Sequence, residues 1–147
     1  MDMFDANQPA PASVNGCKQI YAPRGQAGEY APLATNPYRG CGHGCVYCYV
    51  PRVLRMDRRD FDAGANLRPN YLEALTRDAA RYKAAGITEQ VMLSFTTDPY
   101  HPGDNSATRR TLEILIAHGL GACTLSKEGT QGPRAIALFR PSRAACA

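Results

Sequence analysis

The segment Val91-Met-Leu-Ser-Phe-Thr-Thr-Asp-Pro99 lies at the centre of the predicted fold. Its apolar run, residues 91–95, is too short for a helix, and the Thr-Thr-Asp-Pro sequence after it is a turn signal. A run of this kind is typical of a strand that is buried on both faces in a parallel sheet. Residues 91–95 are therefore predicted to form such a strand, and its partners should lie on either side along the chain.

Helical patterns flank this strand on both sides. Apolar residues recur at helical spacing between Pro69, which suits a first helical turn, and Gly86, which suits a left-handed stop. After the strand, the same spacing predicts a second helix over residues 107–118. Residues 120–125 follow as a further apolar strand, so strand, helix and strand are expected in that order.

The alternation of elements predicts an α/β fold with a parallel sheet. A short strand is expected at residues 33–36, ahead of the first helix, and helical crossovers then join the parallel strands. In parallel α/β folds, functional side chains gather at the carboxyl ends of the strands. At that edge the sequence places a cysteine-rich loop, the Thr-Thr-Asp-Pro segment and Ser126-Lys127.

Three regions are expected along the chain. Residues 1–32 are rich in Pro, Ala, Gln, Asn and Gly without sustained periodicity, which predicts an extended or partly disordered lead-in. Residues 33–140 carry the strands and helices, and residues 141–147 are expected to be an irregular tail. A length of 147 residues suits a single domain of this kind.

The composition indicates a soluble protein. Apolar residues make up 44% of the chain and charged residues 20%, which is typical of globular proteins. No apolar run approaches the roughly 20 residues of a membrane span, and the N-terminal region is not a basic start followed by an apolar run. A cytoplasmic location without membrane association is therefore expected.

Three cysteines stand close together in Cys41-Gly-His-Gly-Cys45-Val-Tyr-Cys48-Tyr49, here called the cysteine loop. Interleaved glycines let the backbone wrap tightly enough for the thiolates to face one metal centre. Electron-transfer clusters normally take four cysteines, so a set of three suggests an iron–sulfur cluster with one iron that has no protein ligand. The spacing alone also allows a structural zinc site, completed by His43 or Cys17.

Arginines gather just after the cysteine loop. The net charge of the chain is +4, and Arg52, Arg55, Arg58 and Arg59 lie within eight positions of one another. Such a cluster can meet phosphate groups, although nearby aspartates offset it. The residues therefore leave open an alternative function, a non-catalytic module that binds zinc or an iron–sulfur cluster together with nucleic acid.

The cysteine loop is one of several motifs that the chain combines. The others are Asn36-Pro-Tyr-Arg-Gly40 before the loop, then Thr97-Asp-Pro-Tyr-His-Pro102, Thr108-Arg109, Leu112-Glu113 and Leu125-Ser-Lys127. Over about residues 33–128 this set resembles the radical S-adenosylmethionine (SAM) superfamily, in the branch related to spore photoproduct lyase that is often labelled DNA repair photolyase. The resemblance implies a partial parallel (β/α) barrel, of which the chain is expected to supply about the first three βα units as a truncated form.

The resemblance also implies cofactors and chemistry. Cys41, Cys45 and Cys48 would hold a [4Fe–4S] cluster, whose remaining iron is chelated by the methionyl amino and carboxylate groups of SAM. An electron from a reductant such as flavodoxin or ferredoxin then cleaves SAM to a 5′-deoxyadenosyl radical, which abstracts hydrogen from a substrate. These motifs do not identify the substrate, for which nucleic acid is one candidate, and the short chain leaves catalytic competence open.

Further residues take roles by the same resemblance. Tyr47 and Tyr49 would lie near the adenosyl group, and Lys127 would pair with the methionyl carboxylate, a partner that suits an ammonium at a strand end. The methionyl amino group or the ribose would be bound by Ser94, Thr96, Thr97 and Asp98. Spore photoproduct lyases use an additional cysteine in this region as hydrogen donor, whereas residues 91–100 contain none. No residue is therefore assigned to that role.

Overall fold

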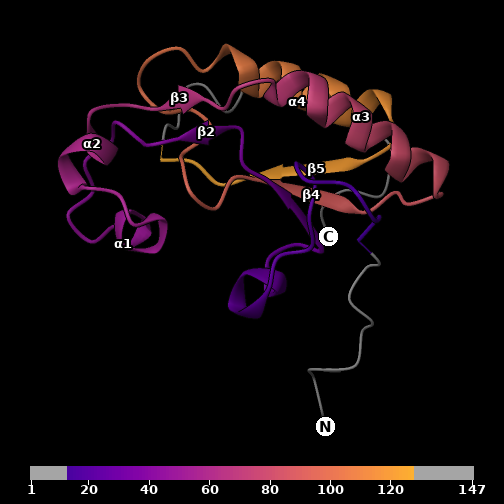
Figure 1. Ribbon diagram of the computed structural model, residues 1–147, viewed down its shortest axis with the longest axis horizontal. Helices are drawn as coiled ribbons and strands as arrows, with labels where there is room; N and C mark the ends of the chain where they lie inside the picture. The colour runs from indigo at the N-terminus through magenta and orange to yellow at the C-terminus, as the bar shows by residue number, and fades with distance from the viewer. Residues whose placement is uncertain (1–12, 128–147) are drawn as a thin grey trace, which may run out of the picture.

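The computed structural model describes residues 13–127, which form a three-stranded parallel sheet with two long helices on one face (Figure 1). The strands are β1 (Leu33–Thr35), β4 (Gln90–Leu93) and β5 (Gly121–Thr124), in the order β1-β4-β5. The helices are α3 (Tyr71–Ala84), which precedes β4, and α4 (Ser106–Ala117), which joins β4 to β5. Within the described residues, no helix is both long and apolar enough to cross a membrane.

The central strand and both long helices lie where the sequence predicts them. β4 pairs in parallel with both neighbours, so that Val91 lies opposite Leu33 of β1 and opposite Ala122 of β5. The helices α3 and α4 begin and end within two residues of the predicted bounds. The three described strands form an open sheet. The barrel implied by the resemblance thus stays a prediction, because residues 128–140, like the expected tail at 141–147, lie outside the described residues.

Two short strands and two short helices that the sequence does not predict lie at one end of the molecule (Figure 1). Strands β2 (Tyr38–Arg39) and β3 (Asn66–Leu67) form an antiparallel pair. Helices α1 (Val50–Leu54) and α2 (Arg58–Asp62) lie between them in the sequence, and a short 3-10 helix, η1 (Gly25–Glu29), precedes β1. Elements of two to five residues are too short to show a hydrophobic period, which explains why local patterns do not reveal them.

The core lies between the sheet and the two long helices. The buried face of α3 repeats every three to four residues, as expected for a helix with one side against a sheet. The fully buried apolar side chains of this core include Leu33, Tyr71, Leu75, Ala79, Tyr82, Val91, Leu93, Leu112 and Leu115. This packing fixes the carboxyl ends of all three strands at the same edge.

The lead-in is held against the domain in its described part, residues 13–32. The Asp78 carboxylate on α3 accepts hydrogen bonds through Oδ2 from the backbone N–H groups of Lys18 at 2.9 Å, Gln19 at 2.6 Å and Ile20 at 3.2 Å. The Ile20 side chain is 1% exposed and belongs to the core. A single buried carboxylate thus orders a segment that composition alone marks as irregular.

The burial of Tyr71 predicts a loss of stability at alkaline pH. Its side chain is 1% exposed, its hydroxyl lies 2.7 Å from Thr35 Oγ1, and burial raises its pKa to about 12. Because the folded pKa exceeds the ordinary value of about 10, the stabilisation is complete below pH 10 and is lost as pH rises toward 12. We expect the free energy of unfolding to fall by about 2 kcal/mol between pH 9.5 and 11.5 from this group.

Urea unfolding of the metal-free chain across this pH range measures the effect. The Tyr71→Phe variant should show a shallower decline than the wild type. Tyr30→Phe is the matched control, because Tyr30 is 65% exposed. Equal declines in the two variants would show that Tyr71 ionisation does not drive the alkaline loss.

Candidate metal centre

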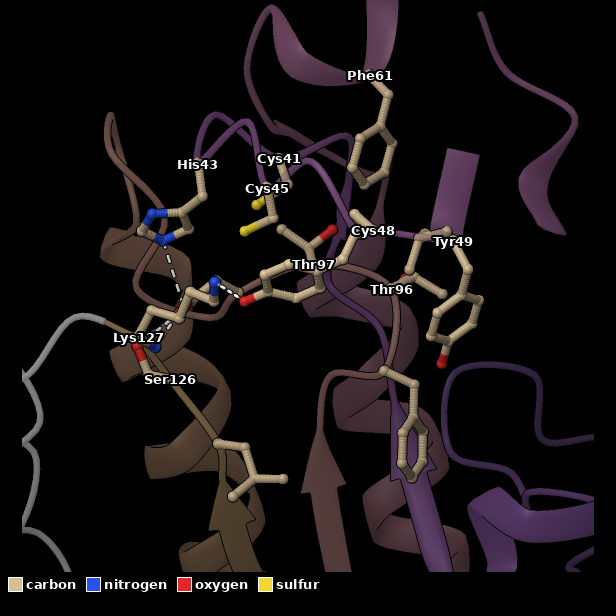
Figure 2. A pocket seen from close by; sticks show the side chains of 15 residues that line it. Cys41, His43, Cys45, Cys48, Tyr49, Phe61, Thr96, Thr97, Ser126 and Lys127 are labelled. Carbon is tan, nitrogen blue, oxygen red and sulfur yellow. Dashed lines mark hydrogen bonds and ion pairs between the residues drawn. The ribbon is translucent and has the colours of Figure 1, made fainter. Parts of the chain in front are cut away.

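A cavity lies at the carboxyl edge of the sheet, where the fold places functional side chains (Figure 2). Its walls come from three parts of the chain: the cysteine loop, residues 95–98 after β4, and residues 125–127 after β5. Phe61 of α2 closes a further side. The cavity has a volume of about 400 Å³. Segments that are far apart in the sequence therefore enclose one site.

Cys41, Cys45 and Cys48 all line this cavity. Each is half-buried and carries a free thiol. Within residues 13–127, no three His, Cys, Asp or Glu side chains are gathered into a group that would hold a single metal ion. A [4Fe–4S] cluster binds each of its cysteines through a different iron, so its ligands surround a body rather than converge on one point. Three thiols along the wall of a cavity fit such a group.

The entry to the cysteine loop is fixed by backbone hydrogen bonds and by a glycine. The N–H of Cys41 donates to the carbonyl of Phe61 at 2.9 Å, and Thr97 Oγ1 donates to the carbonyl of Gly40 at 2.8 Å. Gly40 has a φ of +88°, and a Cβ there would collide with the carbonyl of Gly64. Only glycine allows this approach, so the loop is pressed against the turn between α2 and β3.

Arg58 of α2 holds the middle of the cysteine loop. Its guanidinium donates to the carbonyl of Cys48 at 3.2 Å and to that of Cys45, while its Nε donates to Asp62 Oδ2 at 2.8 Å. The hydrogen bond to Asp62 is the main reason that the pKa of Arg58 is raised, and attraction to Cys48 and Cys45 adds to it. The sequence places Arg58 in an anion-binding cluster, whereas the structure turns it toward the loop.

Ser94 and Thr97, both expected to bind cofactor, have protein partners in the structure. Ser94 Oγ donates to Asn36 Oδ1 at 3.1 Å and accepts from the backbone N–H of Thr97 at 3.2 Å. Ser94 does not line the cavity, and the Thr97 hydroxyl is engaged with Gly40. These two residues shape the segment after β4 and the entry to the cysteine loop.

Asp98 joins the three walls of the cavity. Its Oδ1 accepts hydrogen bonds from Tyr100 N–H at 2.8 Å and Ser126 Oγ at 2.7 Å, and its Oδ2 accepts from Lys127 N–H at 2.8 Å. His43 Nε2 of the cysteine loop lies 3.2 Å from Oδ2, at ion-pair distance but without the alignment of a hydrogen bond (Figure 2). The Asp98 side chain is 9% exposed. Asp98 therefore links the segment after β4 to the segment after β5 and to the cysteine loop.

Thr96 differs from its neighbours in the same segment. Thr96 lines the cavity, and its Oγ1 is buried without a hydrogen-bond partner among residues 13–127. A buried hydroxyl without a partner is costly, which makes it a candidate for contact with a bound molecule. Within residues 94–98, Thr96 is therefore the residue whose buried side-chain hydroxyl lacks a partner in the described part of the chain.

Lys127 brings a positive charge to the cysteine loop. Its Nζ donates to the hydroxyl of Tyr47 and lies 4.4 Å from the centre of that ring (Figure 2). A hydrogen bond from Lys127 is also the main cause of a lowered pKa at the Cys45 thiol, and the pKa of Lys127 is raised in turn by Tyr47 and then Cys45. Lowering a thiol pKa favours the thiolate, which is the form that binds metal.

Aromatic side chains form the remaining walls. Tyr49 lines the cavity and is 68% exposed, and Phe95 lines it from the segment after β4. The structure thus gathers Tyr47, Tyr49, Thr96, Thr97, Asp98 and Lys127 with the three cysteines around one cavity, while Ser94 lies outside its lining.

The chain matches no protein-family model, no curated protein and no solved structure.

Proposed function

We propose that this chain binds a [4Fe–4S] cluster through Cys41, Cys45 and Cys48 and binds SAM beside the cluster in the cavity that these cysteines line, as a radical SAM protein with an unidentified substrate. The observation that carries the proposal is the single cavity that these cysteines share with Lys127 and Thr96. A metal-binding loop, a cation and an unpaired polar group meet there at the carboxyl edge of a parallel sheet, where cofactors commonly bind.

The donor set supports a cluster with one open iron. Thiolates are the usual protein ligands of iron–sulfur clusters, and the loop supplies three of them. Lys127 favours the thiolate form of Cys45, and Arg58 fixes the two carbonyls on either side of Val46 and Tyr47. When bound, the cluster and SAM would supply a 5′-deoxyadenosyl radical for hydrogen abstraction, with the electron provided by a reductant such as flavodoxin or ferredoxin.

The cavity supports SAM as the second ligand. Its volume of about 400 Å³ lies within the range of small-molecule sites. The Lys127 ammonium suits the methionyl carboxylate, the Thr96 hydroxyl suits a polar group of the methionyl or ribose part, and Tyr49 and Phe95 offer apolar faces to the adenosyl part. On this proposal Ser94, Thr97 and Asp98 position the walls.

Anaerobic reconstitution of the full chain with iron and sulfide tests the proposal. We expect about four irons per chain, an electron paramagnetic resonance signal that changes when SAM is added, and 5′-deoxyadenosine after reduction with dithionite. Mass spectrometry of the native protein identifies the bound metal independently. Zinc as the sole metal, in protein that takes up no iron under these conditions, would contradict the proposed function.

Replacing Lys127 is expected to weaken SAM binding. The Lys127→Gln variant removes the ammonium, and a lost charge-assisted hydrogen bond corresponds to roughly a 10- to 100-fold rise in Kd. Lys83→Gln is the matched control, because Lys83 is an exposed residue of α3. Equilibrium dialysis of reconstituted protein, normalised to iron content, gives the two Kd values. A common Kd for both variants would remove Lys127 from the SAM site.

A further inference from the structure

Arg58 makes three hydrogen bonds, two to the cysteine loop and one within its own helix α2. Its guanidinium contacts the carbonyl oxygens of Cys45 and Cys48 and the carboxylate of Asp62. The residue itself is held at the start of α2, where the Asp57 side chain accepts a hydrogen bond from the N–H of Arg59 at 2.8 Å. Arg58 thus projects from a capped turn of helix into the bend between two of the cysteines.

This bend has little apolar packing to hold it. Val46 is 92% exposed and Tyr47 is 72% exposed. Within the bend, the N–H of Cys48 donates to the carbonyl of Cys45 at 3.0 Å, so the conformation is a tight turn. The bend is therefore stabilised by hydrogen bonds rather than by apolar packing, and Arg58 supplies two of these hydrogen bonds from outside the loop.

The chemistry of arginine matters at this position. A guanidinium presents several N–H donors in one rigid plane and keeps its charge, so it can bridge two carbonyls while it also pairs with a carboxylate. A lysine ammonium keeps the charge but lacks the planar fork. The two properties, hydrogen-bonding geometry and charge, are therefore separable by substitution.

We propose that Arg58 is a positioning residue, which sets the cysteine loop in its ligand-presenting conformation before metal binds and places a fixed positive charge beside the cluster. The charge beside the cluster rests on the proposed function, whereas the positioning of the cysteine loop does not. Positive charge near a cluster favours the reduced, more negative state, so it raises the reduction potential. Loss of Arg58 would therefore lower the reduction potential, and the Asp62 carboxylate, left without its ion-pair partner, would lower it further.

The test compares three variants of the full chain: Arg58→Gln, Arg58→Lys and the control Arg59→Gln. Arg59 is the exposed neighbour on α2, and its replacement removes the same charge from the same helix. In the metal-free chain, hydrogen exchange at the Cys48 N–H should be faster in Arg58→Gln than in the wild type and unchanged in Arg59→Gln. After reconstitution, the potential of Arg58→Gln should be more negative, whereas Arg58→Lys should stay close to the wild type.

The outcomes separate the two proposals. Equal Cys48 exchange in Arg58→Gln and Arg59→Gln would overturn the positioning role, and equal potentials in these variants would overturn the charge effect. A wild-type chain that takes up no iron would overturn the proposed function and the charge effect together, while the exchange comparison in metal-free protein would still decide whether Arg58 positions the loop.

Discussion

Replacing Cys41, Cys45 and Cys48 together by alanine is expected to abolish iron binding, lowering the iron content after anaerobic reconstitution from about four per chain to near zero. The physical reason is that the loop would then offer the cluster no thiolate, and carbonyls do not replace thiolates as ligands of iron–sulfur clusters. Iron and sulfide assays, together with the visible absorption of the reconstituted protein, measure the loss. Far-ultraviolet circular dichroism should stay unchanged, because the core lies between the sheet and the long helices.

Cys17→Ala is the matched control for this experiment. Cys17 is also a half-buried free thiol, but it lies outside the cavity, where its Sγ is 3.9 Å from the carbonyl oxygen of Asp78. We expect this variant to retain its iron. A variant that instead loses one bound zinc would favour the four-coordinate zinc site that the spacing of the cysteines also allows.

The Asp78→Ala substitution is expected to destabilise the fold by about 3 kcal/mol. It deletes the acceptor of three backbone N–H groups, and the Ile20 N–H among them would stay buried without a partner. The free energy of unfolding of Asp78→Asn should lie between those of Asp78→Ala and the wild type, because asparagine keeps an acceptor oxygen but loses the charge. Chemical unfolding of metal-free protein at neutral pH measures all three.

Glu73→Ala provides the control for Asp78, since Glu73 is an exposed acidic residue of the same helix. Its effect should stay within about 0.5 kcal/mol. Hydrogen exchange adds a local measurement, in which the N–H groups of residues 18–20 should lose protection in Asp78→Ala. Unchanged protection there would mean that the lead-in is held by its apolar contacts alone.

The elements of this fold that the sequence predicts are those with a regular spacing of apolar residues. The run at 91–95 and the helical spacing on both sides of it place β4, α3 and α4, because a buried strand and an amphipathic helix each repeat their apolar residues over a few positions. The short elements α1, α2, β2 and β3 have no room for such a repeat. Their contacts lie outside any local repeat: β2 pairs with β3, and α2 is joined to the cysteine loop through Phe61 and Arg58.

The candidate site, too, is only partly predictable from the sequence. Motif spacing finds the three cysteines, and strand order brings residues 95–98 and 125–127 to the same cavity. Motif spacing does not show which polar groups already have protein partners, such as the hydroxyls of Ser94 and Thr97, and their assignment to the cofactor stays a prediction. The position of Arg58 is not predictable for a related reason, since its hydrogen bonds to the carbonyls of Cys45 and Cys48 depend on how the chain folds back and leave no pattern in the neighbouring sequence.

The hydrogen bonds of Asp98 join segments that meet only in the folded chain, so the cavity exists only in the folded state. Asp98 collects donors from the segments after β4 and β5, and the Tyr47–Lys127 contact spans 80 positions of sequence. An unfolded chain holds no such arrangement, so a ligand that needs all of these walls binds the native state. By mass action, each tenfold excess of ligand over its Kd adds about 1.4 kcal/mol to the free energy of unfolding. On the proposed function, SAM would thus act as a folding ligand, and its supply in the cell would govern how much of this protein survives.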